Sequence, residues 1–188
     1  MSTTLDQLLD DNLTVLRSTR ELVERLDEAG YRQPAEPLGL SGIGPHVRHS
    51  SDFYLRFLAG LRAPSGEVRR VDYDARDRDP RIETDPGHAA ERLTRIMVDL
   101  RRLPEQVPDL ADASLEVRSD GSPWTPSTVA RELLSLLSHT VHHHALIAVL
   151  LRARAAEVPE GFGVAPSTLR HWAEQRQGAD PAVSSCAR

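Results

Sequence analysis

Apolar residues recur along this chain at steps of three and four positions, in stretches that polar, proline-containing segments separate. Such spacing gathers the apolar side chains on one face of a helix. The first stretch spans residues 4–29, and Gly30, Pro34 and Pro37 follow it as residues that stop helices. Its apolar face consists of Leu5, Leu8, Leu9, Leu13, Val15, Leu16, Leu22, Val23 and Leu26. We therefore expect a first amphipathic helix over residues 4–29.

A second apolar stretch predicts a helix over residues 41–61, with Ser41 as its N-cap. A polar connection then covers residues 63–87, and a connection of that size in a small domain is typical of a crossover or a functional loop. A third helix is expected over residues 86–103, because one proline suits its first turn and another follows its end.

The second half of the chain predicts two further helices. Residues 104–125 have no clear period, apart from a short hairpin that the Asp120-Gly121 turn signal predicts. A fourth helix is expected over residues 126–156 and a short fifth helix over residues 166–175. Prolines and glycines separate these two helices.

These elements together predict an all-α fold. Four long helices with one long connection between the second and the third are typical of a four-helix bundle with a crossover. We expect one domain over residues 1–177, ending in the short fifth helix, and a disordered tail over residues 178–188. Bundles of this kind bind metal ions between facing helices.

Composition and charge narrow the class of protein. The net charge is −5 and all 23 basic residues are arginines without a basic stripe, which argues against nucleic-acid binding. The sequence shows neither the apolar core of a signal peptide nor an uninterrupted apolar run of membrane-spanning length, so we expect no membrane association. A single cysteine, Cys186, fits a cytoplasmic protein, and its place in the polar tail argues against a nucleophilic role.

Histidines carry the candidate chemistry. Six of the eight lie in two segments, IGPHVRHSSDFY in the second helix and SHTVHHHALIAVLL in the fourth. At about 100° per residue, His143 lies about 60° and His139 about 100° from the buried direction of the fourth helix, on the same side. His142 points away, and His144 lies on the other side as a candidate core residue. Histidines four residues apart on a helix can bind one metal ion, so His139 and His143 are candidate ligands.

The second helix offers two candidates for a third ligand. His46 lies about 60° and His49 about 120° from its buried direction, on the same side, so projection slightly favours His46 without excluding His49. Three histidines would leave coordination positions open for water or substrate, as in catalytic metal sites. The competing interpretation is that these histidines are hydrogen-bonded core or surface residues without a metal.

GIGPHVRHSSDFY and SHTVHHHALIAVLL together resemble the two signature segments of the DinB/YfiT-like superfamily, and GFGVAPSTLRHW resembles one branch of it. The resemblance covers about residues 5–175. It implies a bundle with a three-histidine divalent metal site, in which the first ligand follows an Ile-Gly step by five residues. That register selects His49, together with His139 and His143, and leaves His46 as a pocket residue and fallback ligand. It does not identify the metal: zinc, nickel, iron and manganese all suit three imidazoles.

The resemblance also implies a range of activities. Members include transferases and isomerases that depend on a low-molecular-weight thiol such as mycothiol or bacillithiol, and such proteins often form homodimers. A metal-dependent enzyme acting on a small molecule with such a thiol is therefore the leading hypothesis. A metal-dependent hydrolase, a non-catalytic stress-related or small-molecule-binding bundle with a structural metal, and a dimerisation module are the alternatives.

Residues near the predicted metal site are candidates for substrate binding. Tyr73, Arg76 and Arg78, in the crossover, could reach over the metal and bind an anionic substrate, since arginine pairs with carboxylates. The competing interpretation is a solvated loop with weak ion pairs. Metal-bound imidazoles also need partners that fix their tautomers, and Asp52 and Glu132 are candidates for that role.

Overall fold

Helices dominate the computed structural model, which describes residues 4–34, 41–62, 67–107 and 110–178. Over these residues the chain forms seven helices and three strands. The long helices are α1 (Thr4–Val23), α3 (Ile43–Leu61), α5 (Pro86–Gln106) and α6 (Val129–Ala153). The shorter elements are α2 (Glu28–Arg32), β1 (Arg70–Asp72), α4 (Pro80–Thr84), β2 (Ser114–Arg118), β3 (Thr125–Thr128) and α7 (Pro166–Gly178).

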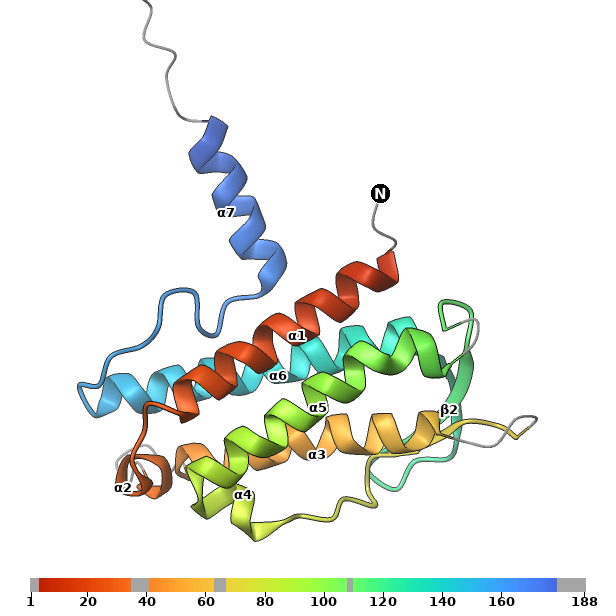
Figure 1. Cartoon of the computed structure of the whole chain (residues 1–188), viewed down its shortest axis with the longest axis horizontal. Coiled ribbons are helices and arrows are strands. Elements are labelled where there is room, and N and C mark those ends of the chain that lie inside the picture. The colour runs from red at the N-terminus through yellow and green to blue at the C-terminus, as the bar shows by residue number, and fades with distance from the viewer. Residues whose placement is uncertain (1–3, 35–40, 63–66, 108–109, 179–188) are drawn as a thin grey trace, which may run out of the picture.

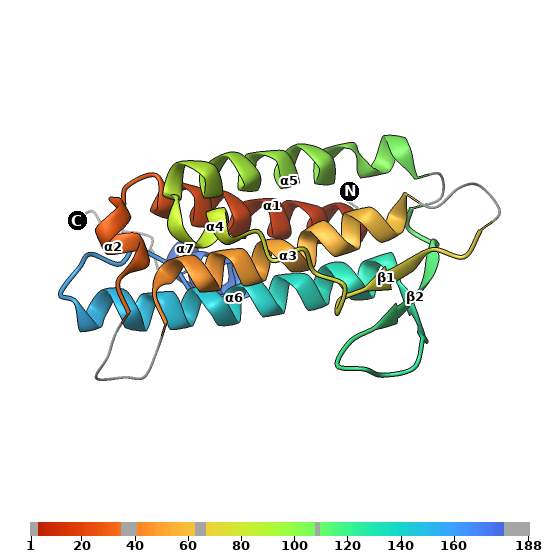
Figure 2. The same cartoon turned by 90° about the horizontal axis from the view of Figure 1, so that it is seen from below.

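The four long helices lie lengthwise beside one another (Figures 1 and 2). α1 packs against α5 and α6, and α3 packs against the same two helices. Their apolar faces meet in one core that is mainly aliphatic, with Tyr31, Tyr54 and Phe57 among its largest buried side chains. α7 extends away from the four, beyond α1 (Figure 1). The predicted predominantly helical class is confirmed.

The first predicted helix is wrong at its C-terminal end. α1 ends at Val23, and a separate short helix, α2, begins after Asp27. Asp27 is the N-cap of α2, since its side chain accepts a hydrogen bond of 2.7 Å from the backbone N–H of Gly30. Gly30 therefore lies inside a helix, where it was expected to stop one. A strong N-cap residue inside the apolar stretch divides it into two helices.

Other helix ends differ from the prediction by a few residues. α3 begins at Ile43 after Gly42, so the expected N-cap, Ser41, lies one residue too early. α5 runs through Pro104 to Gln106, because a proline in the last turn removes only one helical hydrogen bond. α7 extends three residues beyond the expected end of the fifth helix. The predicted tail lies outside the described residues from position 179 onward.

The predicted hairpin is confirmed, and it belongs to a small sheet that the all-α expectation lacked. β2 pairs with β3 in antiparallel fashion, and β1 pairs with β2 in parallel fashion. β1 and the short helix α4 both form within the connection between α3 and α5. Gly44 allows α4 to lie against α3, because a Cβ atom there would meet the carbonyl oxygen of Glu83 at 2.0 Å. The crossover therefore runs closely along α3.

α6 is the one helix in the described part of the chain that is long and apolar enough, by length and composition, to cross a membrane. A core helix of a folded domain passes the same test. The apolar residues of α6 that face α1 and α3 are buried here, and the same helix carries the clustered histidines.

Candidate metal centre

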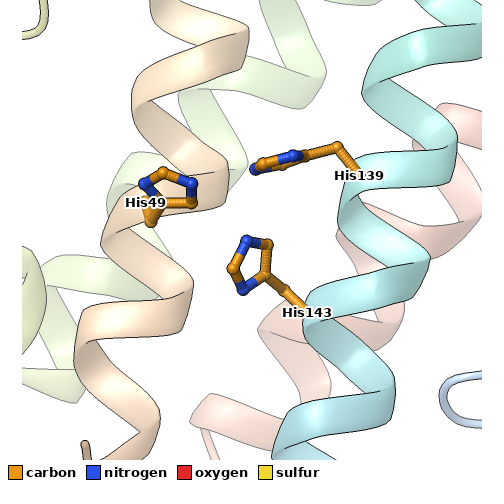
Figure 3. Close-up of side chains that lie close together, drawn as sticks. All are labelled: His49, His139 and His143. Carbon is orange, nitrogen blue, oxygen red and sulfur yellow. The ribbon is translucent and has the colours of Figure 1, made fainter. Parts of the chain in front are cut away.

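Two facing helices place three histidines around a common space. His49 extends from α3, and His139 and His143 extend from successive turns of α6 (Figure 3). The ring centroids lie 4.6 to 4.9 Å apart, and one potential ligand nitrogen of each residue lies within 4.8 Å of the others. Figure 3 shows one ring nitrogen of each histidine directed into the space between the helices. The structure thus brings together the three residues that the sequence predicted as ligands.

The chemistry of this cluster fits a divalent metal ion. His139 Nε2 is buried, and it has no hydrogen-bond partner among the described residues. A buried polar atom without a partner is costly, and a metal ion is one partner that removes this cost. Three imidazoles suit zinc, nickel or iron, and the cluster as described includes no fourth His, Cys, Asp or Glu. Three protein ligands with open positions are the pattern of a catalytic rather than a structural site.

Electrostatics keeps these imidazoles neutral. Burial, followed by the neighbouring His139 and Arg76, lowers the pKa of His49 to about 4. Burial and the other histidines lower the pKa of His143 to about 3, and burial lowers the pKa of His139 as well. At neutral pH each ring therefore carries one proton and one free lone pair, which is the form that binds a metal.

His46 contacts the cluster through His143. It is buried, and its Nδ1 lies 3.0 Å from Nδ1 of His143. If His143 donates this hydrogen bond, its Nε2 carries no proton and is free to bind a metal. His46 is therefore placed to fix the tautomer of His143. It lies outside the three-nitrogen group, although projection had slightly favoured it over His49.

Arg76 contacts the cluster from the crossover, between β1 and α4. Its Nη1 donates a hydrogen bond of 3.2 Å to Nδ1 of His49, and its guanidinium lies 5.2 Å from the ring centre of Phe53. Arginine can only donate, so this contact places the proton of His49 on Nε2. A metal on Nε2 requires the opposite tautomer, with the proton on Nδ1. The contact with Arg76 and a metal on Nε2 therefore exclude each other.

A cavity of about 340 Å³ opens beside His139. Phe53 forms part of its wall and stacks on both His139, at 4.3 Å, and Tyr73, at 5.1 Å between ring centroids. Tyr73 donates a hydrogen bond of 2.8 Å to the buried carboxylate of Glu132, which also lines the cavity. This size falls in the usual range of small-molecule sites. Phe53 and Glu132 carry no local sequence signal for this pocket, because the contacts that form it join distant segments.

The two acids proposed as tautomer-fixing partners have other partners. Arg48 donates to Asp52 at 3.0 Å and also pairs with Glu83. Burial raises the pKa of Asp52, and Arg48 opposes this effect. Glu132 accepts from Tyr73 rather than from a ligand histidine. In the described contacts, His46 takes the place that the sequence had offered to Asp52 and Glu132.

The remaining candidates fall outside the cluster. Arg78 is exposed, and no described contact links it to the three histidines; its role in substrate binding stays a prediction. His142 is exposed, as expected from its direction on the helix. His144 is buried, lies 2.6 Å from Thr19 Oγ1 and stacks on Phe162 at 4.1 Å, so it is the core histidine that the projection suggested.

These features define a predominantly helical protein with a three-histidine cluster between two helices, beside a small cavity. Residues 13–147, well over half of the chain, match the sequence model of the DinB superfamily, so the chain belongs to this superfamily.

Among curated proteins, "FK506-binding protein 5" of Rhizopus delemar is 31% identical over 116 residues. The match covers 60% of this chain but only 30% of that protein. No solved structure matches the chain.

Proposed function

We propose that the chain is a metal-dependent enzyme in which His49, His139 and His143 hold one divalent ion. The observation that carries this proposal is the buried Nε2 of His139, which has no hydrogen-bond partner in the described part of the chain and belongs to a cluster of neutral imidazoles that borders a cavity. Membership of the DinB superfamily supports it. In this proposal α1, α3, α5 and α6 form a four-helix bundle, and the ligands come from its two facing helices α3 and α6.

The proposed reaction is a transfer or isomerisation that depends on a low-molecular-weight thiol such as mycothiol. A bound divalent ion would supply a Lewis acid that holds a thiol as its thiolate. Other residues of the chain would orient a ligand histidine and the substrate. His46 would hold His143 in the binding tautomer, Phe53 would form an apolar wall beside His139, and Arg76 would bind an anionic group of the substrate.

Elemental analysis of untagged protein tests the site. We expect about one equivalent of metal in the wild type after reconstitution, and loss of that metal in His49→Ala, His139→Ala and His143→Ala. His142→Ala is the matched control, because His142 is an exposed neighbour on the same helix. Metal content that is unchanged in His143→Ala would contradict the ligand set. Absence of metal from the wild type, even after reconstitution, would favour the alternative of a non-catalytic helical protein.

A second measurement tests the thiol. With Co²⁺ in the site, a bound thiolate gives a charge-transfer absorption band that water does not give. We expect this band to appear on addition of mycothiol to the loaded wild type and to be absent in His143→Ala. Full metal loading without such a band would point to the alternative of a metal-dependent hydrolase, whose open positions bind water.

A further inference from the structure

The cavity beside His139 has a buried carboxylate as its most unusual feature. Glu132 is 1% exposed, and it accepts three hydrogen bonds. Ser127 Oγ and Arg131 Nη1 donate to Oε1, each at 2.6 Å, and Tyr73 Oη donates to Oε2 at 2.8 Å. A carboxylate can accept about four hydrogen bonds in total, so Oε2 can accept one more. In the described contacts, Oε2 has Tyr73 as its single partner.

Tyr73 also faces the cavity as an acceptor. Burial and the negative charge of Glu132 raise the pKa of Tyr73, so its hydroxyl keeps its proton, which points to Glu132. The lone pairs of Tyr73 Oη are then available to a group that donates. Tyr73 Oη and Glu132 Oε2 thus form a pair of acceptors at the cavity wall.

The arginines of the cavity already have carboxylate partners. Arg131 pairs with Glu132, and Arg118 pairs with Asp72 while it lies 4.7 Å from the ring centre of Trp124. Both are partly exposed to solvent, whereas Glu132 is buried. A ligand group that enters the cavity therefore meets acceptors in the interior, where electrostatic interactions are stronger than at the surface.

We propose that Tyr73 and Glu132 form a specificity site for a hydrogen-bond donor of the substrate, and that the donor it fits best is a primary ammonium group. This inference rests on the proposed function, because Tyr73 and Glu132 would bind one end of a substrate whose other end binds at the metal. Glu132 and His139 are seven residues apart on α6, which corresponds to about 10 Å along the helix. The substrate class is therefore an amine whose ammonium group lies about two helical turns from its metal-binding or thiolate end.

The position of Arg76 agrees with this polarity. Arg76 contacts His49 and the ring of Phe53, whereas Glu132 lines the cavity and is bonded to Tyr73. It favours negative charge next to the metal, and Glu132 favours positive charge away from it. A zwitterionic thiol, with its sulfur at the metal and its ammonium group at Tyr73 and Glu132, has the matching charge distribution.

Three thiols of matched length test the proposal. They are 6-amino-1-hexanethiol, 6-mercapto-1-hexanol and 6-mercaptohexanoate, each titrated into the Co²⁺-loaded protein and followed by the thiolate charge-transfer band. We expect the aminothiol to bind tightest and the carboxylate weakest, with a difference of tenfold or more between the aminothiol and the alcohol. A charge-assisted hydrogen bond inside a protein has an effect of that order.

Two variants connect the preference to these residues. Glu132→Gln removes the charge, and Tyr73→Phe removes only the hydroxyl, so Tyr73→Phe remains informative if Glu132→Gln does not fold. We expect either variant to lower the preference for the aminothiol to within about threefold, with little change in the affinity for the alcohol in Tyr73→Phe. Ser138→Ala, an exposed change on α6 outside the cavity, is the control.

The outcomes separate the two proposals. If all three thiols bind the wild type equally, or the carboxylate binds tightest, the donor site is refuted while the metal and thiol proposal stands. If the aminothiol is preferred but Glu132→Gln and Tyr73→Phe both keep the preference, a different group recognises the ammonium and the assignment to Tyr73 and Glu132 is wrong; a preference that only Tyr73→Phe keeps assigns the recognition to Glu132 alone. If mycothiol gives the band and none of the three does, the donor site is refuted while the thiol proposal stands; if mycothiol gives no band either, the thiol-dependent function fails, and the donor site fails with it.

Discussion

The Nδ1 atoms of His46 on α3 and His143 on α6 lie 3.0 Å apart. One of the two must donate, and a metal on His143 Nε2 requires that His143 does so. The proton of His46 then lies on its own Nε2, which is buried and has no partner among the described residues. His46 thus accepts a hydrogen bond whose geometry selects the binding tautomer of His143.

Replacing His46 should weaken metal binding without abolishing it. In His46→Phe the acceptor for the His143 Nδ1–H is lost while the ring volume is kept, and we expect the metal dissociation constant to rise by about 10- to 100-fold. His46→Asn keeps an acceptor close to the same position and should recover much of the affinity. Competition with a chromogenic chelator measures both values, and equal affinities for the wild type and His46→Phe would exclude the tautomer role.

Arg76 should oppose metal binding. Its hydrogen bond to His49 Nδ1 is incompatible with a metal on Nε2, and its positive charge repels a cation. We therefore expect Arg76→Gln to tighten metal binding, by about threefold to tenfold, although it removes a polar contact of the site. The same competition assay measures the change. Arg78→Gln, an exposed change in the same loop, should leave the affinity as it is, and weaker binding in Arg76→Gln would mean that Arg76 supports His49 as a ligand.

The sequence predicted the histidine cluster more fully than the surroundings of the cluster. His139 and His143 were found by helical period, which depends on local geometry alone. Projection placed His46 nearer the core than His49, and His46 is indeed the more buried of the two. The cluster, however, lies at the edge of the core, where the outer residue, His49, reaches it. Only the register of the family resemblance selected His49.

Features that depend on contacts between distant segments could not be predicted from the sequence pattern. β1 is three residues long, and it exists because residues 70–72 pair with residues 116–118. The hydrogen bond between Tyr73 and Glu132 joins residues 59 positions apart. Neither has a periodic signal, since the period of a helix or strand reports only its own buried face. Local capping also overrode the apolar period where Asp27 begins a new helix.

Gly44 should be essential for the packing of α4 on α3. A Cβ atom at this position would lie 2.0 Å from the backbone oxygen of Glu83, so Gly44→Ala must displace α4. Such overpacking typically lowers the free energy of unfolding by about 1–3 kcal/mol. Gly87→Ala is the control, because its Cβ atom would meet only the Asp85 side chain, at 3.3 Å, and alanine favours a helix. Urea denaturation compares them, and equal stability of Gly44→Ala and the wild type would show that α4 moves freely.

His144 should make the stability of the protein depend on pH. Thr19 Oγ1 donates to the carbonyl of Val15, so it accepts from His144 Nε2–H, and burial lowers the pKa of His144 to about 3. The unfolded chain takes up a proton near pH 6.5, whereas the folded chain does not. The unfolded state thus binds more protons between about pH 6.5 and pH 3, and the free energy of unfolding falls as the pH drops through this window.

Replacing His144 by glutamine should make this dependence weaker. His144→Gln keeps a donor for Thr19 but removes the titrating ring, so its free energy of unfolding should fall less steeply between pH 6.5 and pH 5. The difference in slope approaches one proton, or about 1.4 kcal/mol per pH unit. Urea denaturation in the presence of a chelator separates this effect from metal loss. Because His49 and His143 also have lowered pKa values, the variant should keep a reduced slope rather than none. Parallel curves for the two proteins would show that folding does not lower the pKa of His144.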